Sequence, residues 1–124
     1  MSGRPAIVSI DDDIDGVDAR ITVTLDYRSR HVHGQAVGTS DEQTRLAGEA
    51  TLRAVEELTK GAIGLELLAV ATTEVGIGRV AVAQIRTSED QVLVGTALQG
   101  EEDGKLAAVR AVMDALNRRL GRIL

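Results

Sequence analysis

Alternation of apolar and polar residues predicts six β-strands. In the stretch 19–25, Ile21, Val23 and Leu25 fall on one face of a strand, and Thr22 and Thr24 fall on the other. The same two-residue period predicts strands over 6–10, 31–37, 65–71, 79–86 and 91–98. Short runs rich in Asp, Gly, Ser and Arg separate these segments and are typical of turns.

Apolar residues three and four positions apart predict two helices. The first is expected to begin with Ser40 as its N-cap, to have Gln43 as the partner in a capping box, and to end at Lys60 and Gly61. The second is expected over about 103–120. The predicted buried stripes are Ala47, Ala50, Thr51, Ala54, Val55 and Leu58 in the first helix, and Val109, Val112, Met113, Leu116 and Leu120 in the second.

The two halves of the chain resemble each other. Residues 7–10 match 67–70 at an offset of 60, residues 20–23 match 79–82 at an offset of 59, and residues 33–36 match 94–97 at 61. We therefore predict a single domain over 1–124 with an internal repeat, 6–61 and 65–124. The fold class is α+β, with two βββα repeats related by a pseudo-twofold axis and antiparallel sheets packed on two helices. One six-stranded sheet and two facing layers both fit this pattern.

Composition narrows the classes of partner. The 124 residues include one aromatic, Tyr27, and no Cys, which excludes disulfides, thiolate metal sites and aromatic cages. The net charge of −5 repels nucleic acid. Residues 1–9 lack the pattern of a signal peptide, and no apolar run is long enough to cross a membrane. We expect a soluble cytoplasmic protein with no nucleic-acid or membrane partner.

Two clusters are candidate metal ligands. Asp11, Asp13 and Asp15, followed by Gly16, have the D-x-D-x-D-G spacing of a calcium loop, but Thr22 stands where that loop has its bidentate Glu. The alternative is an acidic, solvated hairpin turn. His31 and His33 share one face of a strand and could address one metal ion, but no third ligand is evident. We expect no metal, cofactor or catalytic residue.

Basic residues gather near the end of the second helix. Arg118, Arg119 and Arg122 suit the negative end of the helix dipole, and an anion site is the alternative interpretation.

The outer strand faces of the two halves differ in polarity. The first half carries Thr22, Thr24, His31, His33 and Gln35. The second half is predicted to carry an apolar set, Ala81, Ala83, Ile85, Val92 and Val94. Because a strand that is apolar on both sides is usually covered on both sides, this set predicts the interface of a homodimer or a higher homo-oligomer.

A family resemblance rests on small residues at the third strand and in the second helix. Each half has Gly-x-Ala at its third strand, and Val94-Gly95-Thr96-Ala97 precedes an Ala-rich helix over 107–117. With the (βββα)₂ order, this resembles the C-terminal regulatory (dimerisation) domain of 2-isopropylmalate synthase and citramalate synthase. The family's Gly-Asn-Gly-Pro turn is absent, and no counterpart of its catalytic barrel is present, so the resemblance implies no synthase activity.

The resemblance also implies where an effector would bind. In that family the end product binds near the domain dimer interface, which corresponds here to the turns 37–40 and 98–101. The implied ligand-binding residues are Val37, Gly38, Thr39, Ser40, Leu98, Gln99 and Gly100.

Three functions remain open from the sequence. The first is a non-catalytic, homo-oligomeric dimerisation or regulatory module that binds a small aliphatic metabolite or a partner protein. The second is a purely structural assembly protein without a ligand. The third is a small enzyme or metal-binding protein that uses His31 and His33.

Overall fold

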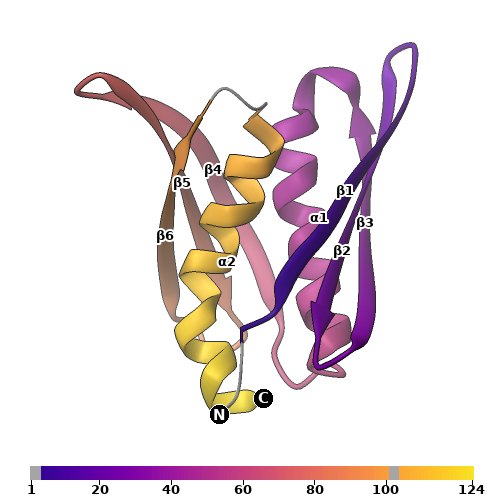
Figure 1. The fold of residues 1–124 in the computed structure, drawn as a ribbon, viewed down its shortest axis with the longest axis vertical. Coiled ribbons are helices and arrows are strands. Elements are labelled where there is room, and N and C mark those ends of the chain that lie inside the picture. The colour runs from indigo at the N-terminus through magenta and orange to yellow at the C-terminus, as the bar shows by residue number, and fades with distance from the viewer. Residues whose placement is uncertain (1–3, 101–103) are drawn as a thin grey trace.

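The computed structural model describes residues 4–100 and 104–124, which form two βββα units (Figure 1). The first unit contains β1 (Ala6–Asp15), β2 (Asp18–Tyr27), β3 (Arg30–Thr39), a short 3₁₀ turn η1 (Ser40–Glu42) and α1 (Gln43–Leu58). The second contains β4 (Leu65–Val75), β5 (Gly78–Thr87), β6 (Val92–Gln99) and α2 (Gly104–Ile123). The predicted α+β fold class with its βββα repeat is confirmed.

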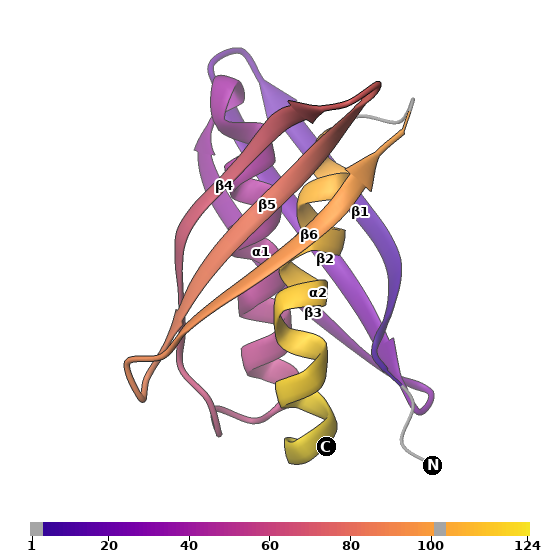
Figure 2. The same ribbon diagram turned by 90° about the vertical axis from the view of Figure 1, so that its left-hand side faces the viewer.

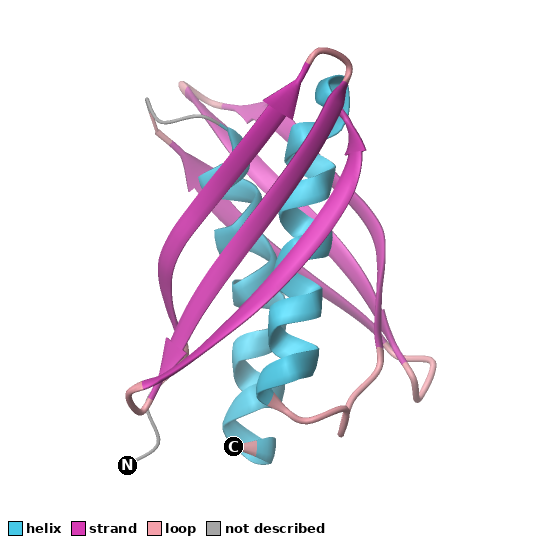
Figure 3. Cartoon of the chain, turned by 90° about the vertical axis from the view of Figure 1, so that its right-hand side faces the viewer, coloured by secondary structure: helices cyan, strands magenta, loops and turns pink. Residues whose placement is uncertain are grey.

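The strands form two separate antiparallel sheets, with strand order β1-β2-β3 (sheet A) and β4-β5-β6 (sheet B). Both helices lie between the sheets and run in the same direction, α1 against sheet A and α2 against sheet B (Figures 1 and 2). Figure 3 shows that the strands cross the helices obliquely and leave the sheets unjoined. Two facing layers, rather than one six-stranded sheet, are therefore observed.

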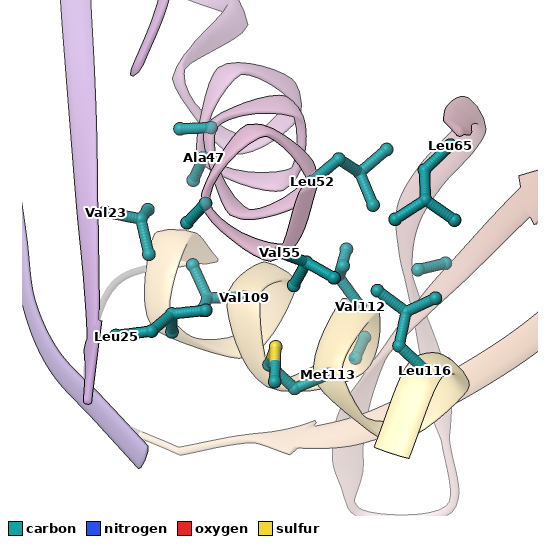
Figure 4. Close-up of a cluster of buried hydrophobic side chains, with 14 of the residues drawn as sticks. Val23, Leu25, Ala47, Leu52, Val55, Leu65, Val109, Val112, Met113 and Leu116 are labelled. Carbon is teal, nitrogen blue, oxygen red and sulfur yellow. The ribbon is translucent and has the colours of Figure 1, made fainter. Parts of the chain in front are cut away.

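The core is aliphatic. Val23 and Leu25 of sheet A lie beside Val109 of α2, and Val55 of α1 and Leu116 of α2 extend the same core toward β4 (Figure 4). All residues of the two predicted helical stripes are buried.

A glycine in each third strand allows its helix to approach the sheet closely. A Cβ at Gly34 would lie 2.0 Å from the carbonyl oxygen of Ala50, and a Cβ at Gly95 would lie 2.1 Å from that of Ala111. No side chain larger than hydrogen fits at such distances from backbone. The two positions are 61 residues apart, so both halves use the same contact.

A bulge in each first strand also repeats. The register shifts at Val8 and again at Leu68, 60 residues later. The extra residue lets Ile7 and Ile10, three positions apart, both pack against the core.

The repeat holds an offset of 60 through the second strands, so the predicted offset of 59 there is wrong. The β1–β2 and β4–β5 hairpins each turn on two residues, and Gly16 and Gly76 have the same φ of +62°. Because the turns are equal in length, Ile21 corresponds to Ala81 rather than to Val80. The offset becomes 61 at the third strands, where Asp26 pairs with His31 and Arg86 pairs with Val92.

Several predicted boundaries need correction. β1 and β4 extend four or five residues beyond the predicted ends, because each turn is only two residues long. Ser40 is not the N-cap of α1: Thr39 is the N-cap of η1, and Glu42 is the N-cap of α1. The Thr39 backbone N–H and hydroxyl donate to Glu42 Oε2 at 3.4 and 3.0 Å. The predicted helix start at Asp103 lies outside the described residues.

Candidate functional site

The two turns predicted to bind an effector lie at the same end of the molecule, where both helices begin (Figure 1). A Cβ at Gly104 would be 3.3 Å from Thr44 Oγ1 and 3.9 Å from the Gln99 side-chain amide, so the two helix starts are neighbours. Val37 and Leu98, which correspond at an offset of 61, are 65% and 75% exposed. Residue Glu101 of the second turn lies outside the described residues.

Lys105 links three elements at this end. Its Nζ donates to Asp12 Oδ2 of β1 at 2.6 Å and to Gln43 Oε1 of α1 at 3.0 Å. The hydrogen bond from Lys105, assisted by its charge, lowers the pKa of Asp12. This side chain therefore acts as a tie between β1 and the starts of both helices.

The acidic run belongs to a strand, so the predicted calcium loop and the predicted acidic turn over these residues are both wrong. Asp11, Asp13 and Asp15 lie in β1, and the turn consists of residues 16–17 alone. Alternate residues of an extended strand are about 6.8 Å apart, so the first and last of the three carboxylates, about 14 Å apart, do not surround one ion as those of a curled loop do. Within 4–100 and 104–124, no three Asp, Glu or His side chains form a group that could hold a metal.

The two histidines are exposed on sheet A, and each contacts its cross-strand neighbour. His31 Nε2 lies 3.4 Å from Asp26 Oδ1, and His33 Nδ1 is 2.9 Å from Thr24 Oγ1. The structure therefore brings each ring to a different partner on β2.

The predicted interface combines residues from opposite faces of sheet B, and its β5 members are misplaced. Ala81, Ala83 and Ile85 are at most 2% exposed and face the helices. Val92 and Val94 are 53% and 57% exposed and lie on the side away from the helices. The error follows from the wrong offset in the second strand, which reversed the assignment of inner and outer positions on β5.

The outer face of sheet B is nevertheless apolar. Strand pairing places Val82 beside Ala71 and Thr96, and Val80 beside Thr73 and Leu98. The outer positions, including the two at the bulge, are Glu66, Leu68, Ala69, Ala71, Thr73, Val80, Val82, Gln84, Arg86, Val92, Val94, Thr96 and Leu98. We call these residues the outer face of sheet B.

A basic groove on the helix side of β6 was not located by sequence reasoning. It has a volume of about 480 Å³ and lies between residues 92–94 and the C-terminal half of α2, which contributes Arg118, Arg119 and Arg122. We call this the β6–α2 groove. The arginine cluster was visible in the sequence, but its position beside a strand edge depends on tertiary packing.

Comparison with known proteins gives no family assignment. No protein-family model matches the chain, and no curated protein is significantly similar to it. None of the described helices is long and apolar enough to cross a membrane.

Proposed function

We propose that the chain is a non-catalytic homodimerisation module that associates through the outer face of sheet B. The carrying observation is the contrast between equivalent positions of the repeat. Val82 and Val94 occupy the places that Thr22 and His33 occupy on sheet A. The chain covers the inner side of each sheet with a helix and leaves this apolar outer side of sheet B open (Figure 2).

A second copy of the chain suits this surface because a twofold interface must be complementary to itself. Glu66 and Arg86 are the only charged residues among the outer positions of sheet B, and their side chains pair at 3.7 Å. Arg86 also lies 3.6 Å from Asp90. Stacking two such faces brings no unpaired charge against its own copy.

Sheet A lacks this self-complementarity. Asp11, Asp13 and Asp26 lie on its outer face with one arginine, Arg20. Two such faces would repel each other through their excess negative charge, so sheet B rather than sheet A supports association.

The dimensions of the face indicate a weak or moderate dimer. Three strands and four cross-strand rows make a surface about 14 by 27 Å, or roughly 400 Å² in the plane. Protruding side chains raise the accessible area of the face above this planar value. The result approaches the lower end of the range for specific interfaces, whose typical size is about 800 Å² per partner. We expect a dissociation constant in the micromolar range.

Sedimentation velocity between about 1 and 100 µM tests the proposal. The wild-type chain should shift from monomer to dimer across this range. Val82→Lys should weaken association by roughly 100-fold, because each copy of the chain would bury one lysine in the symmetric interface. Thr22→Lys adds the same charge at the equivalent position of sheet A and should dimerise like the wild type.

Thermal melts of both variants separate loss of association from loss of folding. A wild-type chain that stays monomeric at the highest concentration contradicts the proposal. Equal disruption by Thr22→Lys and Val82→Lys, with both variants folded, would place the contact elsewhere.

A further inference from the structure

We propose that the β6–α2 groove binds an extended acidic segment of a partner protein, which adds to sheet B as a fourth strand beside β6. This is a site distinct from the outer face of sheet B, because it uses the backbone edge of β6 and the arginines of α2. Edge strands beside a helix are a recurrent mode of peptide recognition, in which main-chain hydrogen bonds provide affinity and side-chain pockets provide specificity.

The edge of β6 offers free backbone groups. In an antiparallel pair, alternate residues point their N–H and C=O toward the neighbouring strand, and the others point away from it. The Thr96 N–H points to the free side, where it donates to Asp114 Oδ2 of α2 at 2.9 Å. By the same alternation, the N–H and C=O groups of Val92 and Val94 face the groove.

The arginines give the groove its charge. Arg119 is partly buried, with 22% of its side chain exposed, and is oriented by a hydrogen bond to Gln91 and by Glu89 at 4.0 Å. Arg118 and Arg122 are exposed, and no carboxylate of the described residues lies within 4.0 Å of either guanidinium. A bound carboxylate would therefore meet two guanidinium groups without displacing a described ion pair.

The spacing of these arginines is close to the side-chain repeat of a strand, although the strands of sheet B cross α2 obliquely (Figure 2). Residues four apart on a helix are separated by about 6 Å along its axis, and alternate residues of a strand by about 6.8 Å. Carboxylates at positions i and i+2 of an added strand can thus address Arg122 and Arg118 together. Arginine forms bidentate contacts with carboxylates, which favours a carboxylate over a neutral polar side chain.

The equivalent positions in the first half of the repeat carry different residues, so the arginine cluster is not a by-product of the fold. Glu57 occupies the place of Arg118, and Arg30 occupies that of Gln91. Arg30 donates to the carbonyl oxygens of Glu57 and Leu58 at 3.3 and 3.0 Å. Moreover, α1 ends at Leu58, the counterpart of Arg119, whereas α2 continues to Ile123 and carries Arg122 past that point.

A second copy of the chain is a poorer occupant than another protein. The acidic edge strand β1 carries Asp11, Asp13 and Asp15 on its outer face. The side that would meet α2 of a neighbour carries Ile10, Asp12 and Ile14, and Asp12 is already held by Lys105. The segment that fits the groove instead has an acidic residue at every second position, and these acidic side chains all face α2.

Fluorescence polarisation with a labelled ten-residue peptide of alternating Glu and Val tests the proposal. The wild-type chain should bind it, more weakly as salt is added. R118E/R122E should weaken binding by roughly tenfold or more. R20E/R79E changes the net charge equally at the opposite end of the sheets and should leave binding unchanged. A peptide with Pro at two central Val positions should not bind, because Pro lacks the N–H needed for strand pairing.

Amide exchange measured by NMR gives a second readout. Bound peptide should slow hydrogen exchange at Val92 and Val94 and leave the equivalent His31 and His33 unchanged. If R118E/R122E fails to fold, R118Q/R122Q is measured in its place.

Three results would overturn the proposal. The first is equal binding of the Pro peptide without amide protection, with competition by succinate, which indicates a small-anion site. The second is binding unaffected by the α2 variants while they remain folded. The third is tighter binding of a peptide of residues 6–15 than of the Glu/Val peptide, which indicates association of copies through β1.

Discussion

Sheets A and B have the same backbone plan and the same inner contacts, but their outer surfaces have opposite chemistry. On the inner side, Gly34 and Gly95 each lie so close to a helix that an added Cβ would be 2.0 and 2.1 Å from a backbone oxygen. On the outer side, Thr22 on sheet A becomes Val82 on sheet B, and His33 becomes Val94. The inner residues are constrained by the helices, whereas the outer residues are constrained only by what lies outside the chain.

The charged residues in the C-terminal halves of α1 and α2 also differ between the two units. Glu57 of α1 and Arg118 of α2 correspond in the repeat, as do Arg53 and Asp114, so both pairs are inverted in charge. Arg53 donates to the carbonyl oxygen of Leu65, while Asp114 accepts from Thr96. Equivalent positions thus perform opposite hydrogen-bonding roles, and the second unit carries the surfaces to which we assign both proposed contacts.

The largest expected effect is on stability, and it shows whether the glycine–helix contacts of the two halves are equivalent. Gly34→Ala and Gly95→Ala should each destabilise the fold by about 3 kcal/mol or more, because the new Cβ meets backbone that cannot move aside locally. Urea denaturation measures both. A small effect at one glycine and a large effect at the other would show that the halves pack differently.

A second comparison separates the two faces of sheet B. Ile85→Ala should lower the free energy of unfolding by about 2 to 5 kcal/mol, because Ile85 is fully buried under α2. Val92→Ala should cost less than about 1 kcal/mol in the monomer, since Val92 is 53% exposed. The measurement is denaturation at a concentration where the chain is monomeric. Equal losses would contradict the assignment of inner and outer positions.

The smallest expected effect concerns Lys105. Its partner Asp12 is matched by Thr72 in the second half, so only the first strand has this tie. Because the folded-state pKa of Asp12 is lowered, its contribution is present above the unfolded pKa near 4 and is lost as pH falls through the folded value. The carboxylate is 42% exposed, so solvent screening limits the contribution to less than about 1 kcal/mol.

Asp12→Asn should therefore be slightly less stable than the wild type at pH 7, and the difference should shrink as the pH falls through the folded-state pKa of Asp12. Thermal melts from pH 7 to pH 2 measure the difference. Asp13→Asn, on the outer side of the same strand, keeps the Lys105 pair and serves as the control. A difference for Asp12→Asn that persists unchanged at pH 2 would show that the effect is not ionic.

Periodicity predicted the elements because each has a regular apolar face. The stripe from Ala47 to Leu58 and the row Ile21, Val23 and Leu25 were found because polar residues separate their members, and all are buried. For β5 the same reasoning assigns the inner and outer faces wrongly. It is apolar on both faces, with Val80 and Val82 outward and the smaller Ala81 and Ala83 inward.

The inner residues of β5 are not fixed by size alone. Gly95 is paired with the small Ala83, but Gly34, which its helix approaches just as closely, is paired with the larger Val23. Alternation alone does not reveal which of two apolar faces meets a helix. The β6–α2 groove was equally hidden, because it depends on the greater length of α2 and on the free edge of β6, neither of which is a local property of the sequence.

The common direction of α1 and α2 has an electrical consequence for the whole molecule. Their macrodipoles add instead of cancelling, with about half a positive charge per helix at one end and half a negative charge at the other. Asp41 and Glu42 lie near the positive end, and Arg119 and Arg122 lie near the negative end. The side-chain charges thus oppose the helix dipoles and outweigh them. A partner molecule with an acidic side would be oriented by this axial field before any contact forms, with that side toward the arginine end.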